Sequence, residues 1–120
     1  MIQKVSVADK FRLIADYWSP RVIGEVNDFW IKAVKFKGEF VWHHHEAEDE
    51  LFYVVDGHFV IRLRDGDVEL GPGEFAVIPR MVEHMPVAEE EVHVLLLEPK
   101  STLNTGNVSN ARTIETLQRI

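Results

Sequence analysis

Hydrophobic and polar positions alternate over short stretches in most of this chain. Between residues 22 and 98, short apolar runs are separated by turn residues, which is typical of β-strands. The predicted strands cover residues 22–25, 29–36, 39–43, 50–55, 58–64, 68–70, 75–78, 85–87 and 92–98. Many short strands at regular spacing favour an antiparallel sandwich or barrel.

Turn residues mark the connections between these strands. Asp56-Gly57 and Asp65-Gly66 lie between apolar runs and predict two β-hairpins. Gly71-Pro72-Gly73 predicts a further turn. The three consecutive glutamates at positions 89–91 are expected to form an exposed turn between the last two strands.

A different pattern begins the chain. Ser6 is followed three residues later by Asp9, an arrangement that can cap a helix. Val7, Phe11 and Ile14 recur at helical spacing and give this segment one apolar face. The sequence therefore predicts a short helix over residues 6–15.

The last stretch of the chain is polar. Residues 101–120 contain three asparagines, and the apolar positions near their end are Ile114, Leu117 and Ile120. Such a segment either drapes over the domain or frays. The predicted organisation is an N-terminal helix and arm over residues 1–21, a barrel over 22–98 and a C-terminal tail over 99–120.

Composition narrows the classes of function. A chain of 120 residues forms one domain, and its net charge of −7 argues against binding to nucleic acid or to an anionic membrane surface. No apolar run approaches the ~20 residues that span a bilayer. There is no cysteine for disulfides or thiolate ligands, and charged residues interrupt the start of the chain, unlike a signal peptide. We therefore expect a cytoplasmic protein.

Three histidines and a glutamate provide the candidate chemistry. In the run WHHHEAEDELFYV, strand alternation places His43 and His45 on one face and His44 on the other. Glu50 follows an acidic turn, and His84 comes later in the chain. Neutral imidazole and ionised carboxylate are good ligands for divalent metals. The three imidazoles and the carboxylate are therefore expected to surround an ion.

The order of these residues resembles the two sequence motifs of the cupin superfamily. The matching positions are Gly38, His43, His45, Glu50 and Gly57 for the first motif, and Gly73, Pro79 and His84 for the second. The segments LFYVVDG and LGPGEFAVIP are also similar to sequences that are typical of cupins. The resemblance covers about residues 29–98 and is to small single-domain bacterial cupins. It implies an all-β double-stranded β-helix, or jelly-roll barrel, after the N-terminal helix.

The resemblance also implies a ligand set. Carried over position by position, the metal ligands are His43, His45, Glu50 and His84, and they hold one divalent transition metal ion. Imidazole and carboxylate do not choose among Fe, Mn, Ni, Co, Cu and Zn. Glu50 can serve as a ligand or as a general base, and these two roles compete.

Three positions depart from the cupin pattern. The interval from Gly38 to His43 is one residue shorter than the motif, Met81 replaces a glycine and Ala88 replaces an asparagine. Without this glycine, the turn at Met81 is expected to differ from the turn in the cupin motif. The Met81 side chain can also narrow the mouth of the cavity. No ligand position is lost.

Other side chains have simpler interpretations. His58 and His93 are expected to be strand or rim residues, and Phe52 or Phe75 can line a pocket beside the metal. An arginine such as Arg80 is usually solvated, although the position of Arg80 near His84 would let it bind an anionic substrate. No second carboxylate is evident in the motif region.

Two functions remain open from the sequence. The first is a metal-dependent enzyme, such as an oxygenase or isomerase acting on a small metabolite; the second is a non-catalytic module that binds a small molecule or a metal. Similar small cupins are commonly dimers, so a homodimer is expected. Apolar residues outside the barrel, Phe11, Ile14, Tyr17 and Trp18, either cover the core or meet a second subunit.

Overall fold

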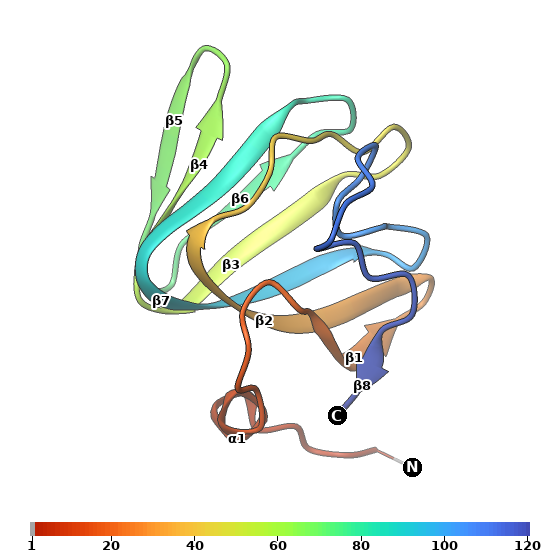
Figure 1. Cartoon of the computed structure of the whole chain (residues 1–120). Helices are drawn as coiled ribbons and strands as arrows, with labels where there is room; N and C mark the ends of the chain where they lie inside the picture. The colour runs from red at the N-terminus through yellow and green to blue at the C-terminus, as the bar shows by residue number, and fades with distance from the viewer. Residues whose placement is uncertain (1) are drawn as a thin grey trace.

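One long bent strand organises the fold. The computed structural model describes residues 2–120, and Met1, the first residue of the predicted arm, lies outside them. Strand β7 (His84–Pro99) pairs with three other strands and passes from one layer of the molecule to the other (Figure 1). The remaining strands are β1 (Arg21–Val26), β2 (Phe29–Glu39), β3 (Glu50–Asp56), β4 (Phe59–Leu63), β5 (Gly66–Leu70), β6 (Phe75–Ile78) and β8 (Gln118–Arg119).

The pairing confirms the all-β jelly-roll prediction. The main path of hydrogen-bonded neighbours is β5-β4-β7-β2-β1-β8, and β3 joins β7 to β6 beside it. Every one of these pairs is antiparallel except β1 with β8. The hairpin predicted at Asp65-Gly66 is confirmed, since β4 and β5 pair on either side of this turn. The hairpin predicted at Asp56-Gly57 is wrong, because β3 pairs with β6 and β7, and β4 pairs with β5 and β7.

The turn predicted at residues 89–91 is wrong. The strands expected at 85–87 and 92–98 are one strand, and residues 89–91 form a bulge inside it. Gly38 pairs with Ala88 and Phe36 pairs with Val92, so three residues of β7 lie opposite one residue of β2. A bulge bends its strand, and this bend carries β7 between the two layers.

The strand predicted at residues 39–43 is also wrong. Strand β2 ends at Glu39, and only His43 forms an isolated bridge, with His84. Phe40 donates its N–H to the carbonyl of Pro86 at 3.0 Å, but a proline has no N–H to return. The ladder is therefore interrupted until His43 and His84 exchange two hydrogen bonds of 3.1 and 2.9 Å.

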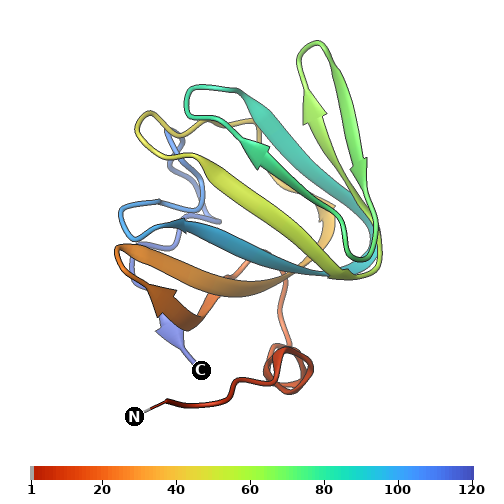
Figure 2. The ribbon, with the colours of Figure 1, turned by 180° about the vertical axis from the view of Figure 1, so that it is seen from behind.

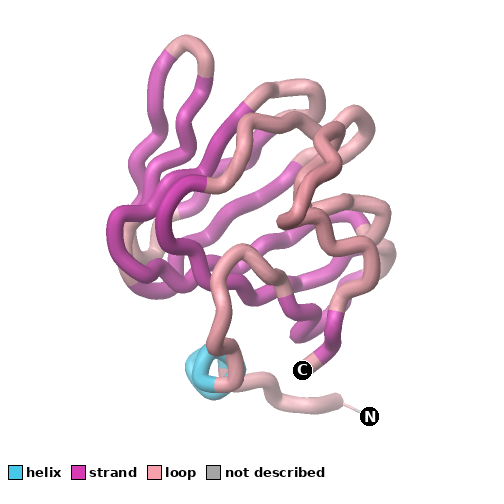
Figure 3. The backbone as a smooth tube through the Cα atoms, viewed as in Figure 1, coloured by secondary structure: helices cyan, strands magenta, loops and turns pink. Residues whose placement is uncertain are grey.

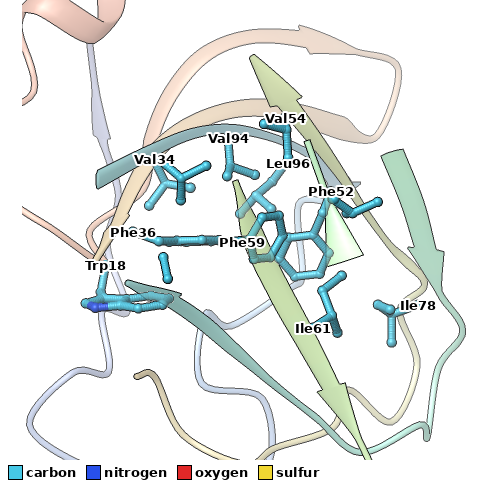
Figure 4. Close-up of a cluster of buried hydrophobic side chains, with 13 residues drawn as sticks. Trp18, Val34, Phe36, Phe52, Val54, Phe59, Ile61, Ile78, Val94 and Leu96 are labelled. Carbon is cyan, nitrogen blue, oxygen red and sulfur yellow. The ribbon is translucent and has the colours of Figure 1, made fainter. Parts of the chain in front are cut away.

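The core lies between the two layers of the barrel (Figure 4). Even-numbered side chains of β2, β3 and β7 point inward, and the labelled ones include Val34, Phe36, Phe52, Val54, Val94 and Leu96. Trp18 closes one side of this cluster, where its ring stacks on Phe36 at 4.3 Å and on Phe40 at 4.9 Å between centroids. Period-two alternation in the sequence thus becomes a single aromatic and aliphatic core.

Helix α1 (Val7–Arg12) packs outside the barrel (Figure 3). Ser6 caps it as predicted, since its hydroxyl accepts the N–H of Asp9 at 3.3 Å. The helix is shorter than expected because Leu13 and Ile14 donate to carbonyls three residues back, which tightens and ends the last turn. No helix in residues 2–120 is long and apolar enough to cross a membrane.

The apolar residues near the helix cover the barrel within the same chain. Phe11 and Ile14 are each 2% exposed and pack with Ala33 on the outer side of β2. Trp18 is also buried, and only Tyr17 keeps substantial exposure. The sequence left open whether these residues cover the core or meet a second subunit. Phe11, Ile14 and Trp18 cover the core.

The C-terminal segment returns along the molecule to the first strand. It lies beside the loop that carries residues 46–49 in both Figure 1 and Figure 2. Its end forms β8, which pairs in parallel with β1, and Ile120 donates its N–H to the carbonyl of Val22 at 3.1 Å. Thr105, in the middle of the segment, is completely buried.

Candidate metal centre

Four buried side chains converge at one end of the barrel. His43 and His45 lie in the stretch between β2 and β3, Glu50 is the first residue of β3 and His84 is the first residue of β7. Each of the four is at most 4% exposed. These are the four residues selected from the sequence, and the fold brings all of them together.

The donor atoms of this cluster face one another. Glu50 Oε1 lies 3.4 Å from His45 Nε2 and 3.3 Å from His84 Nε2. The ring of His43 is centred 4.3 Å from that of His84 and 5.0 Å from that of His45. One ligand atom from each of the four residues lies within 4.8 Å of every other, so a single ion can be shared by all four.

Backbone carbonyls orient two of the imidazoles. Nδ1 of His43 lies 2.9 Å from the carbonyl of Val41, and Nδ1 of His84 lies 2.9 Å from the carbonyl of Val82. A carbonyl oxygen only accepts, so Nδ1 carries the proton in both rings. Nε2 of each ring is left with a lone pair, as a metal ligand requires.

His45 is the member of the cluster that its protein surroundings leave unsatisfied. Both of its ring nitrogens are buried, and neither makes a hydrogen bond. Burying a polar group without a partner costs about 1–3 kcal/mol. Coordination of a metal ion by one nitrogen would remove part of that cost. The cluster consists of three imidazoles and one carboxylate, which are the donor groups of a site for one divalent transition metal ion.

The electrostatics of the cluster favour the protonation states that bind metal. Burial, reinforced by the neighbouring His84, lowers the pKa of His43 to about 4. Burial alone would raise the pKa of Glu50, but the side chains of Glu98, His45 and His84 hold it well below its usual value. A neutral His43 and an ionised Glu50 are the forms that act as ligands.

Stability of the metal-free protein is expected to depend on pH through His43. Below pH 6.5 the unfolded chain protonates this histidine, whereas the folded chain keeps it neutral down to about pH 4. The free energy of unfolding therefore falls by about 3 kcal/mol as pH drops through this window. Urea unfolding at pH 7.5 and 4.5 measures the effect. His43→Gln should lose most of this pH dependence, and equal pH dependence in both proteins would contradict the assignment.

A second buried carboxyl, which the sequence did not reveal, lies beside the cluster. Glu98 is 1% exposed and next to Glu50, and its Oε1 pairs at 2.5 Å with the ammonium group of Lys32, which is also 1% exposed. Burial raises the pKa of Glu98 well above its usual value, and the Glu50 charge adds to this despite Lys32. Glu98 and Lys32 share the inward parity of their strands, and that is the signal by which they could have been found.

A small cavity of about 30 Å³ opens beside the cluster. His43 and Glu50 form part of its wall, together with Glu98 and Asn104. The rest of the wall is apolar and consists of Trp18, Pro20, Val34, Phe36, Phe40, Phe52, Pro86 and Leu96. Phe52 therefore lines the cavity as predicted.

Three residues considered from the sequence lie away from this cavity. Phe75 is 59% exposed on the outer face of the sheet, so its prediction as a pocket residue is wrong. Arg80 and Met81 are both exposed, and neither side chain belongs to the cavity wall. Met81 therefore does not narrow this cavity.

The turn at Met81 keeps the geometry that a glycine would provide. Met81 has φ of 72°, in the left-handed region that favours glycine, and its N–H donates to the carbonyl of His45 at 2.7 Å. The substitution thus places some backbone strain here without breaking the hydrogen bond. Ala88, the other residue that departs from the motif, is buried in the core.

The C-terminal segment holds the ligand loop from outside. Asn107 and the backbone of His44 exchange two hydrogen bonds, of 3.0 and 2.9 Å. A Cβ added at Gly106 would lie 2.2 Å from the carbonyl oxygen of His44 and 3.1 Å from the ring of His43. This packing fixes the backbone between His43 and His45, two residues of the cluster. His44 itself, predicted to face away, is outside the ligand cluster.

The remaining histidines also lie outside the cluster. His58 is exposed, whereas His93 is partly buried and stacks on Phe11 at 4.6 Å between ring centroids. Both are therefore strand or rim residues, in line with the prediction.

Comparison with known proteins identifies the family. The family model described as "Cupin domain" matches residues 32–98, so the chain belongs to the cupin domain family. A crystal structure of a cupin-2 domain containing protein from Shewanella frigidimarina is 48% identical, with a TM-score of 0.79 over 80% of this chain and 94% of that one.

Two curated relatives match shorter stretches. An uncharacterized protein, YdbB, of Bacillus subtilis is 38% identical over 63 residues, which are 52% of this chain and 56% of that protein. An acireductone dioxygenase of Bacillus velezensis is 35% identical over 63 residues, which are 48% of this chain and 35% of the dioxygenase. The chain thus spans about half of the first relative and about a third of the second.

Proposed function

We propose that His43, His45, Glu50 and His84 bind one divalent transition metal ion, and that the protein is a metal-dependent oxygenase for a small metabolite. The observation that supports this most directly is the convergence of the four donors around the unsatisfied ring of His45. The 35% identity to an acireductone dioxygenase over 63 residues adds support for oxygen chemistry.

The residues around the cluster have separable roles in this proposal. A metal ion held by His43, His45, Glu50 and His84 would supply a Lewis acid for the substrate or for oxygen. The carbonyls of Val41 and Val82 hold His43 and His84 in the tautomer that can ligate. Glu50 serves as a ligand here, because its Oε1 lies between the nitrogens of His45 and His84. The apolar wall excludes water from the substrate.

Oxygen consumption tests the proposed reaction. Protein purified without an affinity tag is analysed for metals, loaded anaerobically with Fe²⁺, Ni²⁺ or Mn²⁺, and mixed with aromatic diols, diketones and an acireductone. Oxygen uptake that depends on metal and substrate supports the oxygenase. Conversion without oxygen uptake would indicate an isomerase, and tight substrate binding without turnover would indicate a non-catalytic binding module.

We also propose a homodimer, formed through the outer face of the sheet. Phe29, Leu97, Phe75 and Val77 are between 37% and 59% exposed there. They lie on β2, β7 and β6, and β3 lies between β7 and β6. Strand β6 pairs only with β3 among the described strands, so it is an edge. An apolar face that reaches a sheet edge is a surface suited to a second copy of the same chain.

Light scattering at micromolar concentration tests the dimer. Wild-type protein should give twice the mass of the 13.9 kDa chain, and Phe75→Lys should give the mass of one chain. Leu13→Lys is the matched control, because Leu13 is 66% exposed near the helix and away from this face. A wild-type mass of one chain would refute the proposal.

A further inference from the structure

The cavity beside the ligand cluster is too small to hold a metabolite. Its volume of about 30 Å³ admits little more than water, whereas pockets for small molecules usually exceed about 300 Å³. The four residues of the cluster are at most 4% exposed, so they also have no open face toward solvent. Part of the cavity wall must therefore move before a larger molecule reaches the cluster.

Most of this wall is held in place by strand pairing. Val34 lies on β2, Phe52 on β3 and Leu96 on β7, and each of these strands pairs with at least two others. Asn104 differs, because it belongs to residues 103–114, which contain no strand or helix. A segment outside the sheet opens at lower cost than a paired strand does.

Few contacts hold residues 103–114 against the barrel. Of their hydrogen bonds, only the two between Asn107 and the backbone of His44 reach another part of the described chain. None of the buried apolar side chains among residues 2–120 comes from this segment. Because the segment contributes no side chain to the apolar core, its displacement should leave the core intact.

The segment is bonded to itself and anchored at both ends. The side chain of Asn104 bonds the backbone of Arg112 and Ile114 at 2.7 and 2.9 Å. Before the segment, Lys100 donates its N–H to the carbonyl of Asp28 at 3.0 Å, and after it β8 pairs with β1. Residues 103–114 can therefore swing as one unit between two fixed ends.

Arg112 closes this segment over the cavity. Its guanidinium lies over the rings of Trp18 and Phe40, at 5.5 and 5.8 Å from their centroids, and both rings line the cavity. These are distances at which a cation is attracted to an aromatic ring. Trp18 and Arg112 also form part of the wall of an outer groove of about 480 Å³. Displacement of Arg112 and Asn104 would therefore join the cavity to this groove.

We infer that residues 103–114 are a lid, which opens between its anchored ends and joins the cavity to the outer groove. The volume of the groove is in the range of pockets that bind small molecules, so the open protein has room for a substrate that the closed cavity excludes. The passage of a substrate rests on the proposed function, but the opening itself needs no metal ion.

Two single cysteines measure the opening, because the chain contains no cysteine of its own. Val34 and Val54 are both fully buried inside the barrel (Figure 4), and of the two only Val34 lines the cavity. A buried thiol reacts with iodoacetamide only when it is exposed, at a rate that follows the open fraction if closing is fast. In chelator-treated protein, Val34→Cys should be labelled about tenfold faster than Val54→Cys, after correction for their rates in urea, since local opening costs less than exposure of the core.

A weakened lid should accelerate labelling at the cavity alone. The double variant Asn107→Ala/Arg112→Ala removes the hydrogen bond from the backbone of His44 to Asn107 Oδ1 and the contacts of the guanidinium with the two rings. Together these losses should raise the labelling rate of Val34→Cys about tenfold and leave that of Val54→Cys unchanged. Arg119→Ala is the matched control, because it removes an arginine that lies 5.9 Å over the Trp30 ring outside the lid, and it should change neither rate.

The outcomes separate the lid from the metal site. Equal labelling of the two cysteine proteins would overturn the lid, and so would equal acceleration of both by the double variant, because the cavity would then open only together with the core. If Val34→Cys does not fold, Leu96→Cys takes its place, since Leu96 is 5% exposed and also lines the cavity. Failure of the wild type to bind metal would refute the proposed site and leave the labelling result unchanged.

Discussion

Protein with His84→Ala is expected to bind metal at least 100-fold more weakly than the wild type. Loss of a residue that merely supports a metal ligand typically costs 10–100-fold in affinity, and loss of a ligand should cost more. His84 is fully buried, and its Nε2 faces Glu50 at 3.3 Å, so no other side chain takes its place. Elemental analysis of untagged protein and competition with a chelator measure the effect.

Two controls make this result specific. His58→Ala removes an exposed histidine outside the cluster and should leave metal content unchanged. Circular dichroism of metal-free His84→Ala establishes that the variant folds, because the ring also packs against His43 and Phe52. If folded His84→Ala bound metal as tightly as the wild type, the proposed site would be wrong.

Gly106→Ala is expected to be the most damaging substitution in the C-terminal segment. The new Cβ would lie 2.2 Å from the carbonyl oxygen of His44, and the φ of 57° adds left-handed strain. We expect the free energy of unfolding to fall by about 3 kcal/mol. Metal affinity should fall as well, since the segment positions the backbone between His43 and His45. Urea unfolding and chelator competition check the two effects.

Gly73→Ala is the matched control for this substitution. Gly73 has a φ of 82°, so the strain on its backbone is similar, but a Cβ there would have no atom within 4 Å. The strain alone should cost about 1 kcal/mol and leave metal affinity unchanged. Equal losses in Gly106→Ala and Gly73→Ala would contradict a specific role for the packing against His44.

The sequence revealed the four residues of the candidate metal site because they follow two short motifs. His43, His45 and Glu50 are close together in the chain, and His84 belongs to the second sequence motif. Glu98 was missed because its position beside Glu50 depends on the register between β3 and β7, which local patterns do not supply. The parity that Glu98 shares with Val94 and Leu96 indicates an inward position, but it does not indicate that Glu50 is the neighbour.

The errors in the fold have equally local causes. Three successive glutamates have the composition of an exposed turn, and exposure alone does not distinguish a turn from a bulge within a continuous strand. The strand expected at residues 39–43 failed because the partner segment contains Pro86, a residue remote in the sequence. Alternation alone did not choose between Phe52 and Phe75: Phe52 faces inward on a strand that is paired on both sides, whereas Phe75 is exposed.

The bulge at residues 89–91 separates two paired halves of β7, so a change in length there need not alter the register of either half. His84 is held in register by β4 and Glu98 by β2, and the three glutamates between these pairings are opposite only Lys37. A residue inserted or removed at position 89 or 90 would leave both registers unchanged, whereas the same change inside either paired half would turn its inward side chains toward solvent. Glu91 differs, because its carboxylate accepts a hydrogen bond from Tyr17 and pairs with His93. Changes at positions 89 and 90 are therefore a route to alter the angle between the two layers while both paired halves of β7 keep their register.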